Sequence, residues 1–448
     1  MLSPDAARDK VCQLVEQARR AGADAADAVY VGERSTGLSV RLGELEDVHR
    51  SEGEEIGLRL FVGQRSASTG SSDMSADALS AMVERALAMA AQAPEDPYAG
   101  LAPKQLLANG DAPSLDLDDG QDPSSEALRE RARVAEAAAR GVAGVTNSNG
   151  GSASASASTM AIATSDGFAG SSKATGYSNS ASVVAGEGAG MQRDYGWHSA
   201  RHESDLETPE DIGRRAGERA VARLNPTRVK PGTMAVLFDP RVATSLLGHL
   251  GGAINGASIA RKSSFLQDSL GQQVFAKGVS IHDDPLRPRG LRSRWFDGEG
   301  LPTRPLDLID DGVLTTWMAD SASARQLGIE PTGHAVRGAS GSPSAGPSNL
   351  YLAAGSRSRE EMIAGIKHGV LITELIGMGV NGVTGDYSRG ASGFLIVDGE
   401  IGPPVAEITV ASNLKAMFAT LEPGSDLKFR RGVDSPTVLI PEMTVASA

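Results

Sequence analysis

Residues 144–190 read GVTNSNGGSASASASTMAIATSDGFAGSSKATGYSNSASVVAGEGAG, a stretch built almost entirely from Ser, Ala, Gly, Thr and Asn. Such a composition is typical of a flexible linker. However, residues 152–158 alternate strictly between Ser and Ala, and apolar residues such as Met160 and Ile162 recur nearby. A period of two places alternate side chains on opposite faces of a strand. We therefore favour paired strands whose small side chains face another surface, with Asp166-Gly167 as a type I′ hairpin turn.

The residues before this stretch predict a small α+β domain over residues 1–95. Ser3 and Pro4 form a helix start signal, and apolar residues at helical spacing follow it until Gly22. Strand-like and helical patterns then alternate with Gly and charged residues. The expected elements are a helix between Ser3 and Gly22, strands over residues 28–31, 37–41 and 55–62, and a helix over residues 76–91.

A proline-rich and acidic segment comes next. Five prolines and the run DLDDGQD fall between residues 93 and 123, a composition that does not sustain regular structure. We expect residues 96–123 to be a linker and residues 124–226 to form a strand-rich middle region with flanking helices. One of these helices starts at Thr208 and ends before Asn225-Pro226.

Residues 227–448 predict the largest domain. An apolar strand pattern covers residues 234–238, and Asp239-Pro240 then caps a helix that contains His249. Asp-Gly pairs at 297–298, 311–312 and 398–399 are typical of hairpins and imply antiparallel sheet. The expected fold class is α+β, with a small N-terminal α+β domain, a β-rich middle segment and a larger antiparallel β-rich C-terminal domain with a few helices.

Composition and charge argue against several classes of function. The chain has 43 Lys and Arg against 56 Asp and Glu, a formal net charge of -13 that repels phosphate backbones. The only dense basic stretch, residues 287–294, is broken by Pro and Gly, so we interpret it as a solvated loop and expect no nucleic-acid partner. Cys12 is the only cysteine, which excludes a disulfide within the chain and fits a reducing compartment. The N-terminal residues lack a leader pattern and no apolar run is long enough for a membrane span, so we expect a cytoplasmic protein without a membrane partner.

The histidines do not form a recognisable metal motif. A zinc peptidase helix needs two histidines on one face with a neighbouring glutamate. His198 and His202 are four residues apart, but they lie in a strand-like stretch. His249 sits on the helix after Asp239 and is followed by Leu, Gly, Gly, Ala and Ile. The pattern G-x-G-x-x-G at residues 377–382 lacks the following helix that a dinucleotide site requires, so it does not predict nucleotide binding.

Residues 384–393, TGDYSRGASG, hold an acid, a phenol, a hydroxyl and a guanidinium between glycines. Glycines let the backbone approach another group closely, which favours a binding role. The alternative interpretation is a tight loop in which Asp386 and Arg389 satisfy one another. Both interpretations remain open on the sequence.

Several of these motifs resemble those of one family. The sequence is similar to the PmbA (TldE) type of the TldD/PmbA family, with motifs after residue 230 in matching order. The resemblance implies a partner subunit for a TldD-type chain, which carries an HExxxH zinc motif on the helix that corresponds to the one after Asp239. The matching segments are TELIGMGV (373–380), TGDYSRGASGF (384–394), DGEI (398–401), PVAEIT (404–409), ARKSSFLQDSLG (260–271), SARQLG (323–328), TGH (332–334) and PEM (441–443).

In this sequence the zinc motif position reads HLGGAI, with Leu250 in place of the glutamate and Ile254 in place of the second histidine. The resemblance thus implies no catalytic residue, no metal site and no cofactor in this chain, with zinc in the partner. It implies proteolysis of unfolded peptides, including maturation of modified peptide antibiotics and degradation of an antitoxin. A homodimer is possible when the partner is missing. Candidates for lining a shared peptide cavity are Asp386, Tyr387, Ser388, Arg389, Arg261, Lys262 and His249.

Two alternatives stay open on the sequence. The chain could be a metallopeptidase by itself, with a metal site assembled from dispersed His, Asp and Glu residues that spacing does not reveal. It could instead be a self-associating modulator or binding protein without a proteolytic role.

Overall fold

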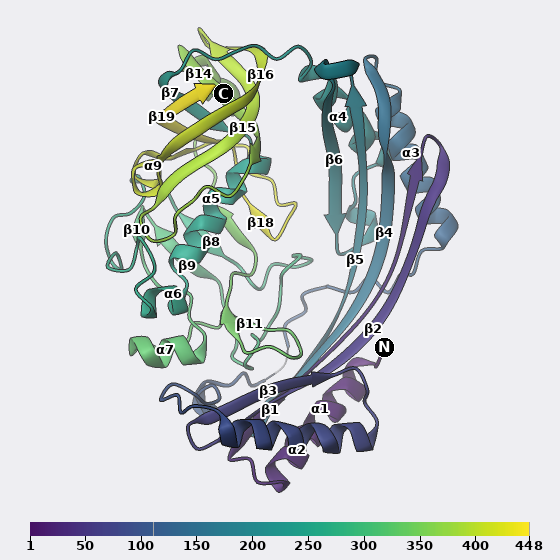
Figure 1. The fold of residues 1–448 in the computed structure, drawn as a ribbon, viewed down its shortest axis with the longest axis vertical. Coiled ribbons are helices and arrows are strands. Elements are labelled where there is room, and N and C mark those ends of the chain that lie inside the picture. Colours follow the sequence, from purple (N-terminus) through teal and green to yellow (C-terminus); the bar gives the residue numbers. More distant parts are fainter. Residues whose placement is uncertain (111, 448) are drawn as a thin grey trace.

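The computed structural model describes residues 1–110 and 112–447. A six-stranded antiparallel sheet, in the order β3-β2-β1-β4-β5-β6, arches along one side of the molecule (Figure 1). Two segments far apart in the sequence share this sheet, because β1 pairs with β2 on one side and with β4 on the other. Its strands are β1 (Ala25–Arg41), β2 (Glu44–Val62), β3 (Arg65–Ser71), β4 (Val145–Thr164), β5 (Ala169–Ala185) and β6 (Gln192–Ala200).

Helices cover the outer side of this arched sheet, and the C-terminal part of the chain lies on its inner side (Figure 1). The Ser3 hydroxyl accepts a hydrogen bond from the Ala6 N–H, and the Thr208 hydroxyl accepts one from Asp211, so both predicted helix starts are confirmed. The apolar faces of these helices pack on the sheet and close its outer cores. The helices are α1 (Pro4–Arg20), α2 (Ala76–Gln92), α3 (Ser125–Arg140) and α4 (Pro209–Ala222).

The Ser-Ala alternation forms the middle of β4, so the predicted paired strands are confirmed. Ala153 is buried beneath Leu128 of α3, whereas the serines point to the opposite face. There, Ser152 Oγ lies 2.8 Å from Ser180 Oγ on β5. The small side chains therefore have a different role on each face of β4. The alanines let α3 pack closely on one face, and the serines pair their hydroxyls across strands on the other.

The first two strands are longer than the sequence predicts. β1 is continuous and joins the expected stretches 28–31 and 37–41, and β2 begins at Glu44 rather than near residue 55. Residues 44–53 are exposed and polar, so they lack the apolar alternation that marks a half-buried strand. Their backbone nevertheless pairs with β1, with one irregularity at Glu46.

The type I′ turn expected at Asp166-Gly167 is wrong, because only Gly167 has a positive φ, at 105°. A type I′ turn needs two such residues. Asp398-Gly399 (φ 50° and 83°) and Asp311-Gly312 (φ 46° and 83°) do have this geometry, between β15 and β16 and between β9 and β10. Asp297-Gly298 lies in a buried loop, with neither residue at positive φ.

The C-terminal part contains a small closed barrel in the order β16-β15-β14-β7-β19, closed by pairing of β16 with β19. Its neighbours are antiparallel except β7 and β14, which run parallel. Helix α5 packs its apolar face against this barrel in the largest core. The strands are β7 (Gly232–Phe238), β14 (His368–Ile376), β15 (Asp386–Val397), β16 (Glu400–Asn413) and β19 (Val438–Ser447), with β17 (Glu422–Pro423) paired to β19.

Shorter elements complete this region. A five-stranded sheet has the order β10-β9-β8-β13-β18, and β11 pairs with β12. No helix in the described ranges is both long and apolar enough to cross a membrane. The strands are β8 (Ile281–Asp283), β9 (Leu306–Asp310), β10 (Val313–Leu314), β11 (Ala335–Val336), β12 (Ser344–Ala345), β13 (Leu350–Leu352) and β18 (Val433–Asp434). The helices are α5 (Pro240–Ala253), α6 (Gly256–Ala260), α7 (Ser321–Leu327), α8 (Arg359–Ala364) and α9 (Leu414–Thr420), with 3-10 turns at Lys104–Leu106, Gly188–Gly190 and Glu203–Asp205.

Buried charges join the arched sheet to the C-terminal part. Asp27 on β1 accepts hydrogen bonds from Arg59 on β2 and from Arg337, whose Nη1 lies 2.7 Å away. The expected linker also reaches the C-terminal part, because Arg325 donates to the Gly100 carbonyl at 2.8 Å and Ala108 N–H donates to the Gly300 carbonyl at 2.9 Å. The two parts are therefore held together by direct contacts, while the domain limits expected from the sequence stay a prediction.

Candidate functional site

Strand β15 separates the four candidates of the segment 386–389 by simple alternation. Tyr387 is buried, whereas Asp386 and Ser388 are exposed on the opposite face. Asp386 accepts hydrogen bonds from Thr384 at 2.7 Å and from Asn413 at 3.2 Å. Arg389 donates to the Ile376 carbonyl at 3.4 Å, so these two residues do not satisfy one another as the alternative interpretation requires.

Tyr387 meets His249 of α5 on the inner face of β15. Their rings lie 6.0 Å apart in an edge-to-face arrangement. Burial, with the nearby positive charge of Arg389, lowers the pKa of His249, and burial raises the pKa of Tyr387 to about 12. Both groups are therefore neutral near pH 7. His249 Nε2 and the Tyr387 hydroxyl are buried without a hydrogen-bond partner among the described residues.

The surroundings of His249 do not fit a zinc ion. Leu250 and Ile254 are fully buried in the core and offer no ligand atom. The guanidinium of Arg389 places a positive charge near the imidazole, which opposes binding of a cation. A catalytic zinc site needs about three protein ligands. In residues 1–110 and 112–447, no group of three or more His, Cys, Asp and Glu is arranged to hold a metal.

Arg261 and Lys262 follow α6 and are exposed. Lys262 has a positive φ of 55°. The same segment touches the loop before β15, because the Phe265 N–H donates to the Gly382 carbonyl at 3.0 Å. The segment that follows these two exposed cations is thus hydrogen-bonded to the loop that precedes β15.

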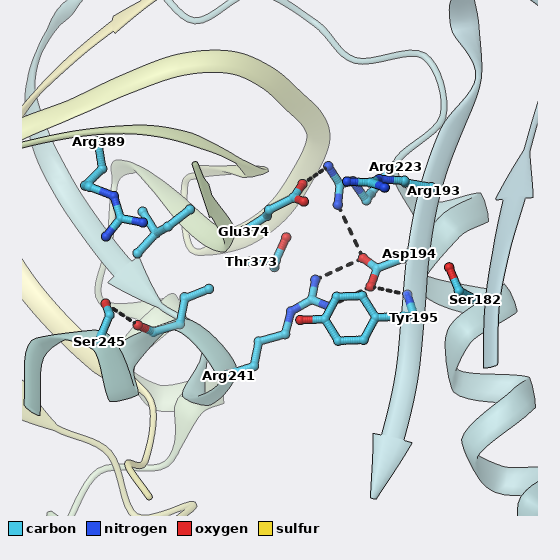
Figure 2. A pocket seen from close by; sticks show the side chains of 12 residues that line it. Ser182, Arg193, Asp194, Tyr195, Arg223, Arg241, Ser245, Thr373, Glu374 and Arg389 are labelled. Carbon is cyan, nitrogen blue, oxygen red and sulfur yellow. Dashed lines mark hydrogen bonds and ion pairs between the residues drawn. The ribbon is translucent and has the colours of Figure 1, made fainter. Parts of the chain in front are cut away.

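A pocket of about 410 Å³ separates the arched sheet from the barrel (Figure 2). β6 and the end of α4 supply one wall, and α5, β14 and β15 supply the other. Of the seven predicted residues, Arg389 lines this pocket. The other lining residues are Ser182, Arg193, Asp194, Tyr195, Arg223, Arg241, Val242, Ser245, Thr373, Glu374 and Leu375.

Asp194 on β6 is the centre of this pocket's ion pairs and is 3% exposed. It accepts hydrogen bonds from Arg241 at 2.6 and 2.9 Å and from Arg223 at 3.4 Å (Figure 2). Arg223 also pairs with Glu374 of β14. Burial alone would raise the pKa of Asp194, but hydrogen bonds and charge from Arg241 hold it below its ordinary value. The carboxylate therefore stays charged and ties the two walls together.

A second pocket of about 320 Å³ shares Tyr195 and Arg241 with the first. Seven cationic side chains line it against three carboxylates, so the fold gathers more positive than negative side chains around this pocket. Three of the cations lie within residues 428–431, and the other four come from three separate segments of the chain that the fold brings beside them. They are Arg215, Arg219, Arg241, Arg359, Lys428, Arg430 and Arg431, and the carboxylates are Asp239, Asp426 and Asp434.

The basic stretch at residues 287–294 is also not a simple solvated loop. Arg287 lies over the Phe429 ring, with its guanidinium carbon 4.3 Å from the ring centroid. Arg289 forms ion pairs with Asp116 and Asp205. These arginines are used internally, as contacts between the C-terminal part, the expected linker and the segment after β6.

Comparison with known proteins identifies the class of protein to which the chain belongs. Family models of the PmbA/TldA metallopeptidase match three regions, as domain 1 at residues 26–90, the central domain at 118–224 and the C-terminal domain at 231–447. Domain 1 and the central domain build the arched sheet, and the C-terminal domain contains the barrel and α5. The chain thus has the domain composition of this class of metallopeptidase.

Individual relatives narrow the assignment. The chain is 40% identical to the metalloprotease PmbA of Escherichia coli O157:H7 over 417 residues, covering 92% of this chain and 90% of that protein. A crystal structure from Bacteroides thetaiotaomicron, described as a candidate modulator of DNA gyrase, matches with a TM-score of 0.92 at 25% identity over the full length of both chains. TldE of Thermococcus kodakarensis shares the fold, with a TM-score of 0.87 at 21% identity over 98% of this chain and 100% of that one. The chain belongs to the PmbA/TldD family, and the predicted resemblance to PmbA is confirmed.

Proposed function

We propose that this chain is the non-catalytic subunit of a two-subunit zinc protease, in which a TldD-type chain supplies the metal and both chains hold an unfolded peptide. The environment of His249 carries this proposal. Its neighbours are a buried phenol and a guanidinium, where a peptidase needs a second imidazole and a carboxylate. An inactive metal position in a chain that retains the whole fold favours a partner role.

The long sheet offers a way to hold a peptide. β6 is an edge strand of the arched sheet, and its Tyr195 and Trp197 face the pockets toward the C-terminal part. An extended peptide can add to such an edge through backbone hydrogen bonds that tolerate many sequences. This mode suits a protease that acts on unfolded chains.

The exposed candidates fit a surface shared with the partner. Asp386 and Ser388 lie on the outer face of β15, and the segment that follows Arg261 and Lys262 is hydrogen-bonded to the loop that precedes this strand. In the proposed complex these four residues line the outer part of a cavity between the chains, whereas Arg389 lines the inner pocket. We place the complex in the cytoplasm, with a homodimer as the state of the chain without its partner.

Co-expression with a TldD-type chain from the same genome tests the proposal. The expected result is a stable complex that contains zinc and cleaves an unfolded peptide, while this chain alone contains no stoichiometric zinc and cleaves nothing. Chelator-sensitive cleavage by this chain alone would show a self-sufficient metallopeptidase. Failure to form any complex, with a TldD-type chain that is fully active alone, would favour a separate binding or modulator role.

A further inference from the structure

Two half-buried cations in the second pocket, Arg219 and Arg431, have no carboxylate partner within 4.0 Å among the described residues. Arg219 of α4 donates to the Tyr195 carbonyl at 3.4 Å, and Arg431 donates to the Arg241 carbonyl at 3.2 Å. Neither guanidinium has a carboxylate within 4.0 Å among the described residues, nor does Lys428. Burial lowers the pKa of both arginines, which reflects a cost of keeping them charged there.

The carboxylates of this pocket are already used by other groups. Asp239 caps α5 and pairs with Arg359 at 3.0 Å. Asp426 accepts hydrogen bonds from the Thr437 N–H and hydroxyl at 2.8 and 2.7 Å. Asp434 accepts two backbone N–H groups, both at 3.0 Å. Arg219, Arg431 and Lys428 therefore stay without a carboxylate within 4.0 Å among the described residues and are available to an external anion.

Neighbouring groups hold several cations of the pocket in place, Arg431 among them. Arg215 and Arg430 share Glu207, at 2.6 Å each. Arg431 stacks on Trp197, with its guanidinium carbon 4.8 Å from the ring centroid. A guanidinium fixed by an aromatic ring and a backbone carbonyl is pre-organised for a planar carboxylate.

We propose that this second pocket binds peptide carboxylates, so that acidic side chains or a free C-terminus of an unfolded peptide anchor beside β6. The cations responsible are Arg219, Arg431 and Lys428. The choice of a peptide as ligand rests on the proposed function. The size of the pocket, about 320 Å³, suits one or two carboxylate groups, and the net charge of -13 disfavours a long polyanion such as nucleic acid.

Binding of labelled peptides to the chain alone, followed by fluorescence anisotropy, tests the proposal. Four short unstructured peptides differ only in carrying Glu or Gln at the same positions and a free or amidated C-terminus. The Glu peptides, the free-carboxylate peptides or both should bind in a salt-sensitive manner, and the arm that binds identifies the carboxylate. Equal binding of all four peptides would overturn the proposal.

Substitutions locate the site. Arg431→Gln should weaken binding of the acidic peptide about tenfold, the effect of one lost charge-assisted hydrogen bond. Lys428→Gln, at an exposed position, should weaken it less and serves as a second test if Arg431→Gln unfolds. Arg214→Gln is the matched control, because this side chain lies on the same helix as Arg219 but is 60% exposed outside the pocket. Unchanged binding by both Arg431→Gln and Lys428→Gln would overturn the proposal, as would tighter binding of a short single-stranded DNA.

This experiment separates the two proposals. Peptide binding is measured on the isolated chain and needs neither zinc nor cleavage. If acidic peptides bind but no active complex forms with a TldD-type chain, the proposed function fails and the carboxylate site stands. If the complex is active but acidic peptides bind no more tightly than neutral ones, the proposed function stands and the carboxylate site fails.

Discussion

Arg241 on α5 and Asp194 on β6 form a buried, bidentate ion pair that joins the C-terminal part to the arched sheet. The two hydrogen bonds measure 2.6 and 2.9 Å (Figure 2). The Arg241 side chain is 8% exposed and that of Asp194 is 1% exposed. Since both pockets are lined by Arg241, this pair fixes the spacing of the walls that the proposed peptide site requires.

Asp194→Asn should destabilise the protein by about 3 to 5 kcal/mol, because it leaves buried Arg241 without its counter-charge and removes one of the two carboxylate partners of Arg223. Chemical denaturation monitored by circular dichroism measures the change. Glu130→Gln is the control, since it removes an exposed partner of Arg133 and should cost less than about 1 kcal/mol. Equal effects of the two substitutions would contradict a structural role for the Asp194 ion pairs.

Two helical glycines should respond in opposite directions to alanine. A Cβ at Gly213 on α4 would lie 2.0 Å from the Ala135 carbonyl oxygen on α3, so Gly213→Ala should destabilise by about 1 to 3 kcal/mol. A Cβ at Gly248 on α5 meets nothing within 4 Å, so Gly248→Ala should stabilise by about 1 kcal/mol through helix propensity. Thermal unfolding of both variants checks this, and stabilisation by Gly213→Ala would show that α3 and α4 pack less closely than described.

Tyr387→Phe should leave stability unchanged or raise it by about 1 kcal/mol, because the lost hydroxyl is buried without a partner among the described residues. Tyr30→Phe is the matched comparison. The Tyr30 hydroxyl accepts a hydrogen bond from the Leu2 N–H at 2.8 Å and donates one to Glu54, so its loss should cost about 1 to 2 kcal/mol. A marked loss of stability in Tyr387→Phe would show that this hydroxyl has a bound partner.

Asp297 should produce a pH-dependent loss of stability. Burial, with the negative charge of Glu299, raises the pKa of Asp297 from 3.8 to about 6. The folded protein therefore favours the protonated acid, and this contribution is complete below about pH 4 and is lost as the pH rises to about 6.

Asp297→Asn resembles the protonated acid at every pH. Between about pH 3 and 7 the wild type should lose about 3 kcal/mol relative to this variant, as measured by urea unfolding at several pH values. A constant difference between the two proteins across this range would contradict the raised pKa.

Helices and strands could be predicted from the sequence where a short residue pattern, such as a helix cap or an alternation of period two, is typical of one local structure. Ser3-Pro4 and Thr208 predicted helix starts, and the hydroxyls of Ser3 and Thr208 do cap helices in the structure. The Ser-Ala alternation of residues 152–158 predicted a strand, although the hydrophobicity of this stretch is low. The exposed half of β2 could not be predicted in this way, because its residues show no apolar alternation and its backbone pairing with β1 is not visible in the sequence.

Fewer residues of the candidate site could be predicted from the sequence, because the site depends on contacts between segments that are distant in the chain. Alternation along β15 could have separated Tyr387 and Arg389 from Asp386 and Ser388, yet which face turns inward depends on the closed barrel. Asp194 showed no motif at all. Its importance follows only from the approach of Arg223 and Arg241 in the folded chain.

We propose that this chain contributes no metal ligand to the complex, and replacement of His249 within the active complex is the sharpest test of that proposal. The complex of a TldD-type chain with the His249→Ala variant should retain its zinc content and its peptidase rate, measured side by side with the wild-type complex. Loss of both zinc and activity in that complex, with the subunits still associated, would show that His249 belongs to the metal site and would contradict the account.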